Sequence, residues 1–211
     1  MTKTKYFLLT IAALVLAMTM ACGGGMKTGP VQLKGNQYGD FTYGLNEAGN
    51  GIVITGYAGA GGRVTIPPVI EDIPVVEIGE NSFRGSGGDT GNPRAGDGIT
   101  SVVIPIGVRK IGRGAFADCR NLISVTLPDT VEEIREVAFR GCTTLISINL
   151  PARLKLMGLN AFYLDGELSN VSIPVGMAAI EWQGWNHFAG CGKLPFDIQL
   201  RLRALGYPAG F

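Results

Sequence analysis

The sequence predicts an α/β-type repeat solenoid of about five rungs, closed by an N-terminal β-hairpin cap and a C-terminal helical cap. Three observations carry this prediction. Prolines recur every 23 residues, at Pro105, Pro128, Pro151 and Pro174. A short run of alternating apolar and polar residues precedes each proline, which is typical of a half-buried strand. Apolar residues then recur in register after each proline, so that stacked units share one continuous core.

Residues 1–21 have the pattern of an export signal, with Lys3 and Lys5 ahead of an apolar run that ends at small residues. The run is short for a membrane span. Cys22 and three glycines follow at once, and this arrangement resembles a bacterial lipoprotein signal, in which the cysteine becomes the lipidated first residue. We therefore expect lipid attachment at Cys22 and a position in the bacterial cell envelope, at its outer surface. The alternative is cleavage after Ala21, which gives a freely secreted protein.

The next two segments are expected to be a tether and the first cap. Residues 22–40 are rich in glycine at their start and form the tether. Residues 41–60 form the cap, as a hairpin that turns near residues 48–51, where Ala-Gly-Asn-Gly favours a turn. A cap is needed because the open end of a solenoid exposes strand edges and apolar core.

Residues 61–194 hold the repeats, and the unit that begins at 124–127 illustrates them. Its apolar residues alternate with polar ones, and Pro128 ends the strand because proline lacks a backbone donor. Apolar residues at 131–134 then turn the chain back over the core. Ala-Phe at 138–139 is expected on a short helical turn, which a glycine or an aspartate helps to end.

Two insertions interrupt the period. The first, at residues 85–98, is rich in Gly, Asp, Asn and Pro and is expected to be a loop. The second adds three residues to the last unit, and we place it near 182–185, where the sequence reads Trp-Gln-Gly-Trp.

The segment 195–211 is expected to form the C-terminal cap. Strict alternation favours a strand, and the alternating apolar residues are Phe196, Ile198, Leu200 and Leu202. The residue types favour a helix, since Gln, Leu, Arg and Ala are helix formers and the charges suit the helix dipole, with an acid near the start and arginines near the end. Gly206 suits a helix end. We predict a helix.

The pattern V-x-x-I-G-x-x-A-F-x-x-C-x-x-L over residues 108–122, nearly repeated over 131–145, resembles the BspA-type leucine-rich repeat of bacterial surface proteins. The spacing L-x-x-V-x-L at 122–127 matches the leucine-rich pattern as well. The resemblance covers about residues 41–194. It implies a surface-exposed or secreted protein used in adhesion or protein binding, and it implies no catalysis.

Two sets of residues are candidates for protein binding. The first is the exposed face of the strands, which offers Ser124, Thr126, Ser147, Asn149, Asn170 and Ser172. Five strands about 4.8 Å apart and about 17 Å long give this face an area on the order of 400 Å². That area is about half of what each partner buries in a standard interface, so we expect the strand face alone to bind weakly.

The second candidate set lies in the last unit and comprises Trp182, Trp185 and His187. The tryptophans either plug the C-terminal end of the solenoid or contact a partner, because Trp offers a large contact area at low entropic cost. His187 is expected to be exposed beside the irregular loop; the alternative is a pocket that it forms with the two tryptophans.

Composition and charge exclude several function classes. A formal net charge of +1 leaves no basic excess to neutralise phosphates, which disfavours nucleic acid as a partner. Cys119, Cys142 and Cys191 share one slot of the repeat, interrupted by Asp165, and are expected to be buried free thiols; oxidation of the first two to a disulfide is the alternative. The sequence also lacks the ligand spacing of a zinc site and a nucleophile to pair with its one histidine.

The sequence therefore predicts a non-enzymatic, envelope-anchored binding module, with a protein as partner, contact with a membrane through the N-terminal lipid and no cofactor. The alternative is a structural or assembly component that stacks with other envelope proteins.

Overall fold

The computed structural model describes residues 33–87 and 94–208. The expected signal segment, Cys22 and most of the tether lie outside the described residues, as does the middle of the 85–98 insertion. Within the described part, no helix is both long enough and apolar enough to cross a membrane. The buried hydrophobic residues of this part lie between Tyr43 and Tyr207 and form one core.

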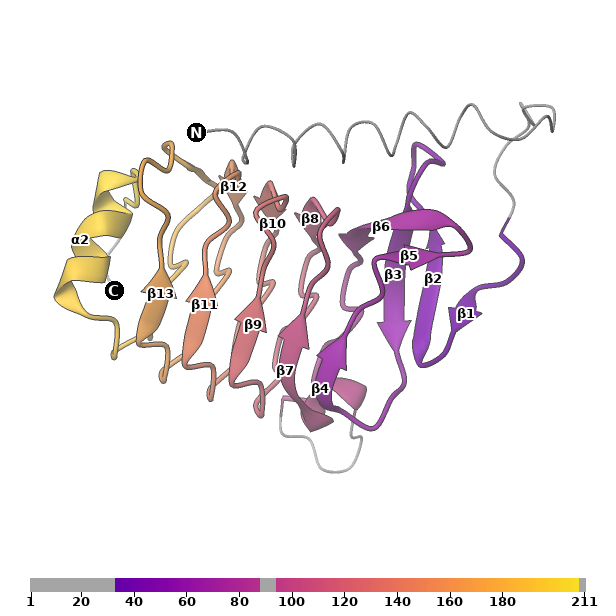
Figure 1. The fold of residues 1–211 in the computed structure, drawn as a ribbon. Coiled ribbons are helices and arrows are strands. Elements are labelled where there is room, and N and C mark those ends of the chain that lie inside the picture. Colours follow the sequence, from indigo (N-terminus) through magenta and orange to yellow (C-terminus); the bar gives the residue numbers. More distant parts are fainter. Residues whose placement is uncertain (1–32, 88–93, 209–211) are drawn as a thin grey trace, which may run out of the picture. The chain divides into compact units, whose positions relative to one another are not determined.

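The chain winds into a β-solenoid with a sheet on each of two sides (Figure 1). One sheet contains five parallel strands, one from each rung, in the order β13-β11-β9-β7-β4. These strands are β4 (Gly62–Thr65), β7 (Ile99–Val103), β9 (Ser124–Thr126), β11 (Ser147–Asn149) and β13 (Asn170–Ser172). Their register pairs residues 23 apart from β7 onwards, as in Val102 opposite Val125, so the predicted repeat solenoid of about five rungs is confirmed.

The second sheet joins the cap strands to the short strand that follows each proline. Its path runs β1-β2-β3-β6-β8-β10-β12-β14, and β5 pairs with β6 beside this path. The strands are β1 (Gln37–Tyr38), β2 (Phe41–Leu45), β3 (Ile52–Tyr57), β5 (Val69–Ile70), β6 (Ile73–Ile78), β8 (Lys110–Ile111), β10 (Glu133–Ile134), β12 (Leu156–Met157) and β14 (Glu181–Trp182). Because every rung contributes to both sheets, the core lies between them.

Tight turns close each rung behind the core. The predicted turn at Ala138–Phe139 is a hydrogen-bonded turn rather than a regular helix, and Gly141 ends it with φ 74°. Asp118 takes the equivalent position with φ 63°, as expected for a residue that tolerates the left-handed region. A second left-handed position precedes the phenylalanine by two residues; it holds Asn or Gly in other rungs but Val137 here, at φ 50°. A β-branched residue in this conformation is strained.

Stacked phenylalanines run through the whole core. Phe83, Phe116, Phe139, Phe162 and Phe188 are all buried. The ring centroids of successive members lie 5.0, 5.3, 5.2 and 5.2 Å apart. The expectation that stacked units share one continuous core is confirmed, and the stacked rings lie inside it.

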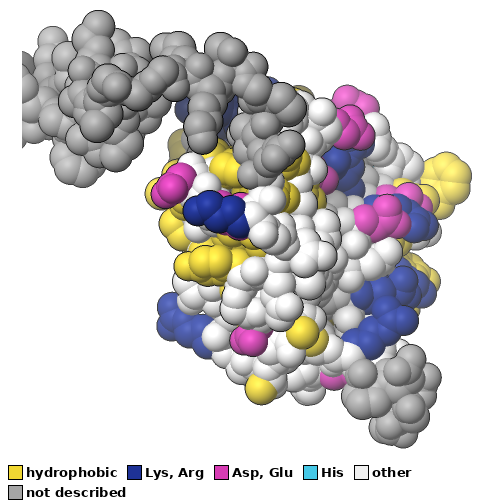
Figure 2. Space-filling view, turned by 90° about the vertical axis from the view of Figure 1, so that its right-hand side faces the viewer, with side chains coloured by type: hydrophobic (Ala, Val, Ile, Leu, Met, Phe, Trp, Pro, Cys, Tyr) yellow, Lys and Arg dark blue, Asp and Glu magenta, His cyan; other side chains and the backbone are white. Residues whose placement is uncertain are grey.

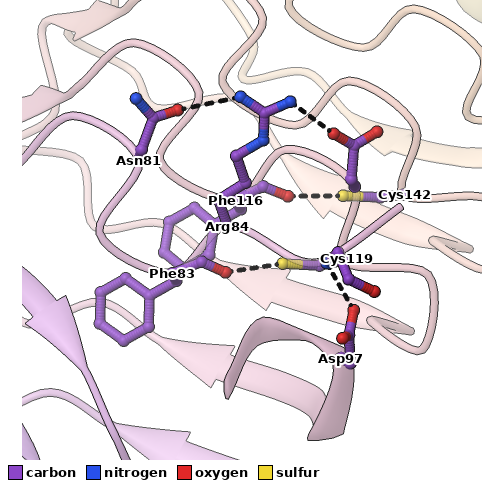
Figure 3. A network of polar contacts seen from close by, with 9 residues as sticks. Asn81, Phe83, Arg84, Asp97, Phe116, Cys119 and Cys142 are labelled. Carbon is purple, nitrogen blue, oxygen red and sulfur yellow. Dashed lines mark hydrogen bonds and ion pairs between the residues drawn. The ribbon is translucent and has the colours of Figure 1, made fainter. Parts of the chain in front are cut away.

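A row of thiols follows the phenylalanines. Cys119, Cys142 and Cys191 are buried and unoxidised, so the favoured prediction of free thiols is confirmed. The thiol of Cys119 donates to the carbonyl of Phe83 at 3.0 Å, and that of Cys142 to the carbonyl of Phe116 at 3.1 Å (Figure 3). Each thiol thus satisfies a carbonyl of the preceding rung.

Asp165 occupies the same slot in the next rung and is fully buried. One of its carboxyl oxygens, Oδ1, accepts a hydrogen bond of 2.8 Å from the backbone N–H of Cys142, while Oδ2 has no hydrogen-bond partner in the described part of the chain. Burial therefore raises the pKa of this carboxyl well above its usual value.

The N-terminal end is capped by the antiparallel hairpin of β2 and β3. At its turn, the side-chain carbonyl of Asn46 accepts from the backbone N–H groups of Asn50 and Gly51. β1 precedes this hairpin and pairs with β2, so the chain is already ordered within the segment expected to be a tether. At the other end, residues Phe196–Ala204 form the helix α2, as predicted.

The alternating apolar residues of α2 do not all face the core. Leu202 is buried and Ile198 is half-buried, whereas Phe196 and Leu200 are 79% and 59% exposed. Residues two apart on a helix point in nearly opposite directions, and residues four apart share a face. A helix therefore divides an alternating sequence into one inward and one outward apolar pair.

Candidate protein-binding surfaces

The polar strand face is built as predicted, but its residues differ in exposure. Thr126, Asn170 and Ser172 are exposed, while Ser124, Ser147 and Asn149 are half-buried, and all six lie on β9, β11 and β13. The Asn149 side chain is engaged by the neighbouring rung, since its oxygen accepts from Leu127 N at 2.9 Å and its amide donates to Leu127 O at 2.7 Å. The side-chain amide of Asn149 therefore takes the place of a backbone partner for Leu127, at the point where the two strands end.

An apolar groove of about 520 Å³ lies where these strands begin. Ile123 and Ile146, which directly precede β9 and β11, line it and are close to half exposed. Its other lining residues are Gly98, Thr100, Asn121, Thr144 and Glu167. Sequence reasoning missed this groove, although the two isoleucines recur 23 residues apart directly after the repeat's buried leucine, a position that the core does not need.

Trp182 and His187 belong to the C-terminal cap. The register places Trp182 opposite Met157, which is buried in the preceding rung, and Trp182 is half-buried and packs against the core there. Its indole N–H donates to the carbonyl of Leu205 at 2.9 Å, and its ring lies 5.1 Å from that of Tyr207. The expected position of the insertion at 182–185 is therefore wrong in part, because added residues already precede Trp182.

The expectation of an exposed His187 is also wrong. The side chain is fully buried, with its ring 5.2 Å from that of Trp182 and 5.8 Å from that of Tyr207. Its Nε2 lies 3.2 Å from the carbonyl of Gln183, to which it donates, whereas Nδ1 has no hydrogen-bond partner among the residues that the structure describes. Burial lowers the pKa of the imidazole, so His187 is a neutral packing residue of the cap.

Trp185 differs from its two sequence neighbours. Its side chain is 65% exposed, and it makes no ring contact with Trp182 or His187 in the described part of the chain. Its backbone carbonyl accepts from the N–H of Asn160 at 3.4 Å, which fixes the loop and leaves the indole outward. The structure thus separates the predicted trio into two buried or half-buried packing residues and one exposed ring.

Charged side chains pair along the second sheet. Lys155 contacts Glu132 at 2.6 Å and Lys110 contacts Glu77 at 2.9 Å, each across neighbouring rungs. The ammonium of Lys155 lowers the pKa of Glu132. In Figure 2, acidic and basic side chains accordingly lie beside one another on the molecule. Such exposed ion pairs contribute little to stability, and the two signs offset each other where they pair.

The described residues contain no group of three His, Cys, Asp or Glu side chains arranged to hold a metal ion. The buried polar side chains among them, Ser82, Asp165 and His187, belong to three separate parts of the core. What the described geometry offers is surface for contact: a polar strand face, the groove beside it and exposed apolar side chains near the C-terminal end.

Comparison with known proteins agrees with this architecture. The chain is similar to a leucine-rich repeat protein of T. pallidum at 27% identity and a TM-score of 0.57, over 82% of this chain and 96% of that one. It is also similar to a leucine-rich repeat protein of Bacteroides ovatus at 29% identity and a TM-score of 0.55, over 75% of this chain and 45% of that one. None of the curated proteins matches the sequence.

The sequence itself matches a family model over residues 95–205, which is more than half of the chain. That model describes a BspA-type leucine-rich repeat region and finds six copies. Repeats of this type occur typically in bacterial surface proteins, and they generally act as scaffolds for protein contact rather than as enzymes. The repeat, the register and the match together show that this chain belongs to the BspA-type leucine-rich repeat family.

Proposed function

We propose that the chain is a non-enzymatic, envelope-anchored module that binds a protein partner. One observation carries this proposal: the groove lined by Ile123 and Ile146 begins where the polar strand face of β9 and β11 begins. The groove adds apolar contact area to a polar face that is too small by itself. A combination of an apolar strip and a polar surround is the usual anatomy of a protein interface.

The test compares capture of envelope proteins by a lipid-free chain, residues 23–211, with capture by its variants. Ile146→Asp puts a charge into the groove and is expected to reduce capture at least tenfold. Ile106→Asp is the matched control, because Ile106 is 81% exposed and lies outside the groove. Equal loss with both variants, or with neither, would contradict the assignment of this surface.

Anchoring is tested separately. We infer that Cys22 carries lipid, on the strength of the apolar run and the three glycines beside it. Labelled fatty acid should enter the wild-type protein in cells and should not enter Cys22→Ser. Equal labelling of both proteins would remove the anchor from the proposal and would leave secretion.

An assembly role is the second candidate function. It is favoured by the two apolar side chains that α2 directs away from the core, Phe196 and Leu200. A terminal cap of a repeat protein normally has a polar outer face, because that face meets water.

A further inference from the structure

The exposed side of α2 carries a protruding side chain at one end of the helix, and a hollow flanks the helix at the other end. Phe196, at the first turn, is 79% exposed and forms the protrusion. The hollow, of about 510 Å³, lies at the other end of the helix. It is lined by Ile173, Pro174, Val175, Gly176, Met177, Arg201, Ala204 and Leu205, and most of these are apolar.

Three residues of the helix connect the two features. Phe196, Leu200 and Ala204 are spaced by four, are all exposed and therefore share one face. At about 1.5 Å per residue, Phe196 and Ala204 lie about 12 Å apart along the axis, with Leu200 midway. Val175, on the far side of the hollow, is fully exposed and extends this apolar stripe beyond the helix.

We propose that this stripe binds a second copy of the same chain, in an end-to-end dimer with two-fold symmetry. If two α2 helices meet antiparallel with the axis at Leu200, Phe196 of each copy reaches the Ala204 end of the other, where the hollow lies. The two leucines then meet at the axis. A surface that carries both the protrusion and its hollow at opposite ends is self-complementary, which is the requirement of an isologous interface.

The charges of α2 favour the same orientation. Asp197 is beside the protrusion, and Arg201 lines the hollow. An antiparallel pair brings the acidic first turn of each helix to the basic last turn of the other, and it also opposes the two helix dipoles. A parallel pair would place like charges side by side, so the charge pattern selects one orientation.

The size of the surface predicts a weak dimer. A nine-residue helix is about 14 Å long, and together with the hollow it offers less than the roughly 800 Å² that each partner buries in a standard interface. Two chains attached to one membrane would meet at a high effective concentration, which makes a weak contact sufficient. This self-association is independent of the partner proposed for the groove and is tested without it.

The test uses residues 23–211, which retain every buried residue of the described core and lack Cys22. Sedimentation over a range of concentrations should show a monomer–dimer equilibrium for the wild-type chain. Leu200→Glu places two carboxylates at the axis and should weaken dimerisation at least tenfold at an unchanged melting temperature. Ile106→Glu makes the same kind of change at an exposed residue far from α2 in the sequence and should leave dimerisation unaltered.

Cross-linking gives an independent measurement of the orientation. The remaining native cysteines are buried, so Leu200→Cys introduces an accessible thiol at the proposed axis. With a small disulfide as oxidant, two such thiols lose two protons and two electrons and form an intermolecular disulfide, while the oxidant is reduced to two thiols. Leu200→Cys should cross-link rapidly and Ile106→Cys at least tenfold more slowly.

Two results would overturn the proposal. One is a monomer at every concentration, accompanied by equal cross-linking of the two cysteine variants. The other is a monomer whose binding to anionic phospholipid vesicles is abolished by Leu200→Glu, which would assign the face to a lipid surface instead of a second copy.

Discussion

Replacement of Asp165 by cysteine should make the protein more stable at neutral pH and less sensitive to pH. The carboxyl of Asp165 is buried in a slot that holds cysteine in three other rungs, and one of its oxygens has no hydrogen-bond partner within residues 33–87 and 94–208. Its pKa is raised well above the usual value because burial disfavours the charged form. The folded chain therefore retains a proton that the unfolded chain releases.

The sign and the size of the effect follow from linkage. A carboxyl whose folded pKa is raised favours the folded state at low pH, and it loses this advantage as the pH rises above the unfolded pKa of about 3.9. Between the unfolded and the folded pKa, the free energy of unfolding should fall by about 1.4 kcal/mol for each pH unit. Asp165→Cys removes this slope, so its advantage over the wild type should grow from pH 4 toward pH 7.

Urea denaturation of wild type and variant at half-unit steps between pH 4 and pH 7.5 measures the difference. The other buried titratable groups do not obscure it: burial keeps the thiols of Cys142 and Cys191 neutral in this range, and the lowered pKa of His187 affects both proteins alike. Asp165→Asn is a second control, because it keeps the size of the side chain and cannot titrate. Parallel curves for wild type and Asp165→Cys would refute the reasoning.

Five further substitutions test the packing. Phe139→Ala should cost about 3–5 kcal/mol of unfolding free energy, because it opens a cavity in the middle of the ring column, whereas Ser124→Ala should change it by less than about 0.5 kcal/mol; equal denaturant midpoints would contradict the assigned orientation of the strand residues. Val137→Asn should raise the stability by about 1 kcal/mol, since the left-handed conformation disfavours a β-branched residue, and a lower melting temperature would show that the valine packs better than its backbone suggests. Trp182→Ala should cost about 3 kcal/mol and Trp185→Ala close to none, and a reversed order in calorimetry would exclude the proposed division between packing and exposed ring.

The repeat was predictable because its period is marked by several residue types at once. Proline, valine, phenylalanine and cysteine all recur at the same spacing, so an error in one slot does not move the others. The ring column from Phe116 to Phe162 follows directly from this spacing, since stacked units place equal positions above one another. Physical chemistry then assigns the apolar residues of each strand to the inside.

The last rung was less predictable because an insertion removes the marks of the register. Ile180 and Trp182 are both apolar and both fit the core slot on sequence grounds, whereas the structure pairs Trp182 with Met157 and buries Ile180 beside it. His187 is packed against Tyr207, a residue that follows α2 in the sequence and whose ring lies against the imidazole. Contacts of this kind come from the way in which the cap folds back, and no local pattern encodes them.

Two features of the candidate surfaces depend on geometry that a sequence does not show. The amide of Asn149 has the same sequence context as an exposed strand residue, but it reaches the end of the neighbouring strand and pairs with Leu127. The groove at Ile123 and Ile146 lies where the simple alternation of inside and outside does not hold, because each isoleucine directly follows a buried leucine and two residues separate that leucine from the next buried one.

The ring column also bears on how such a chain changes its length. Among the described aromatic rings, each inner ring contacts the one above and the one below it, and these contacts are nearly identical from Phe116 to Phe162. The two ends are chemically distinct, with Tyr57 stacked on Phe83 at one and Tyr207 packed on Phe188 at the other. Duplication of 23 residues between Phe116 and Phe162 would insert one more rung. The new rung would pack against neighbours of nearly the same shape as its own. The polar face would lengthen by about 4.8 Å for each duplication, while both ends stay as they are.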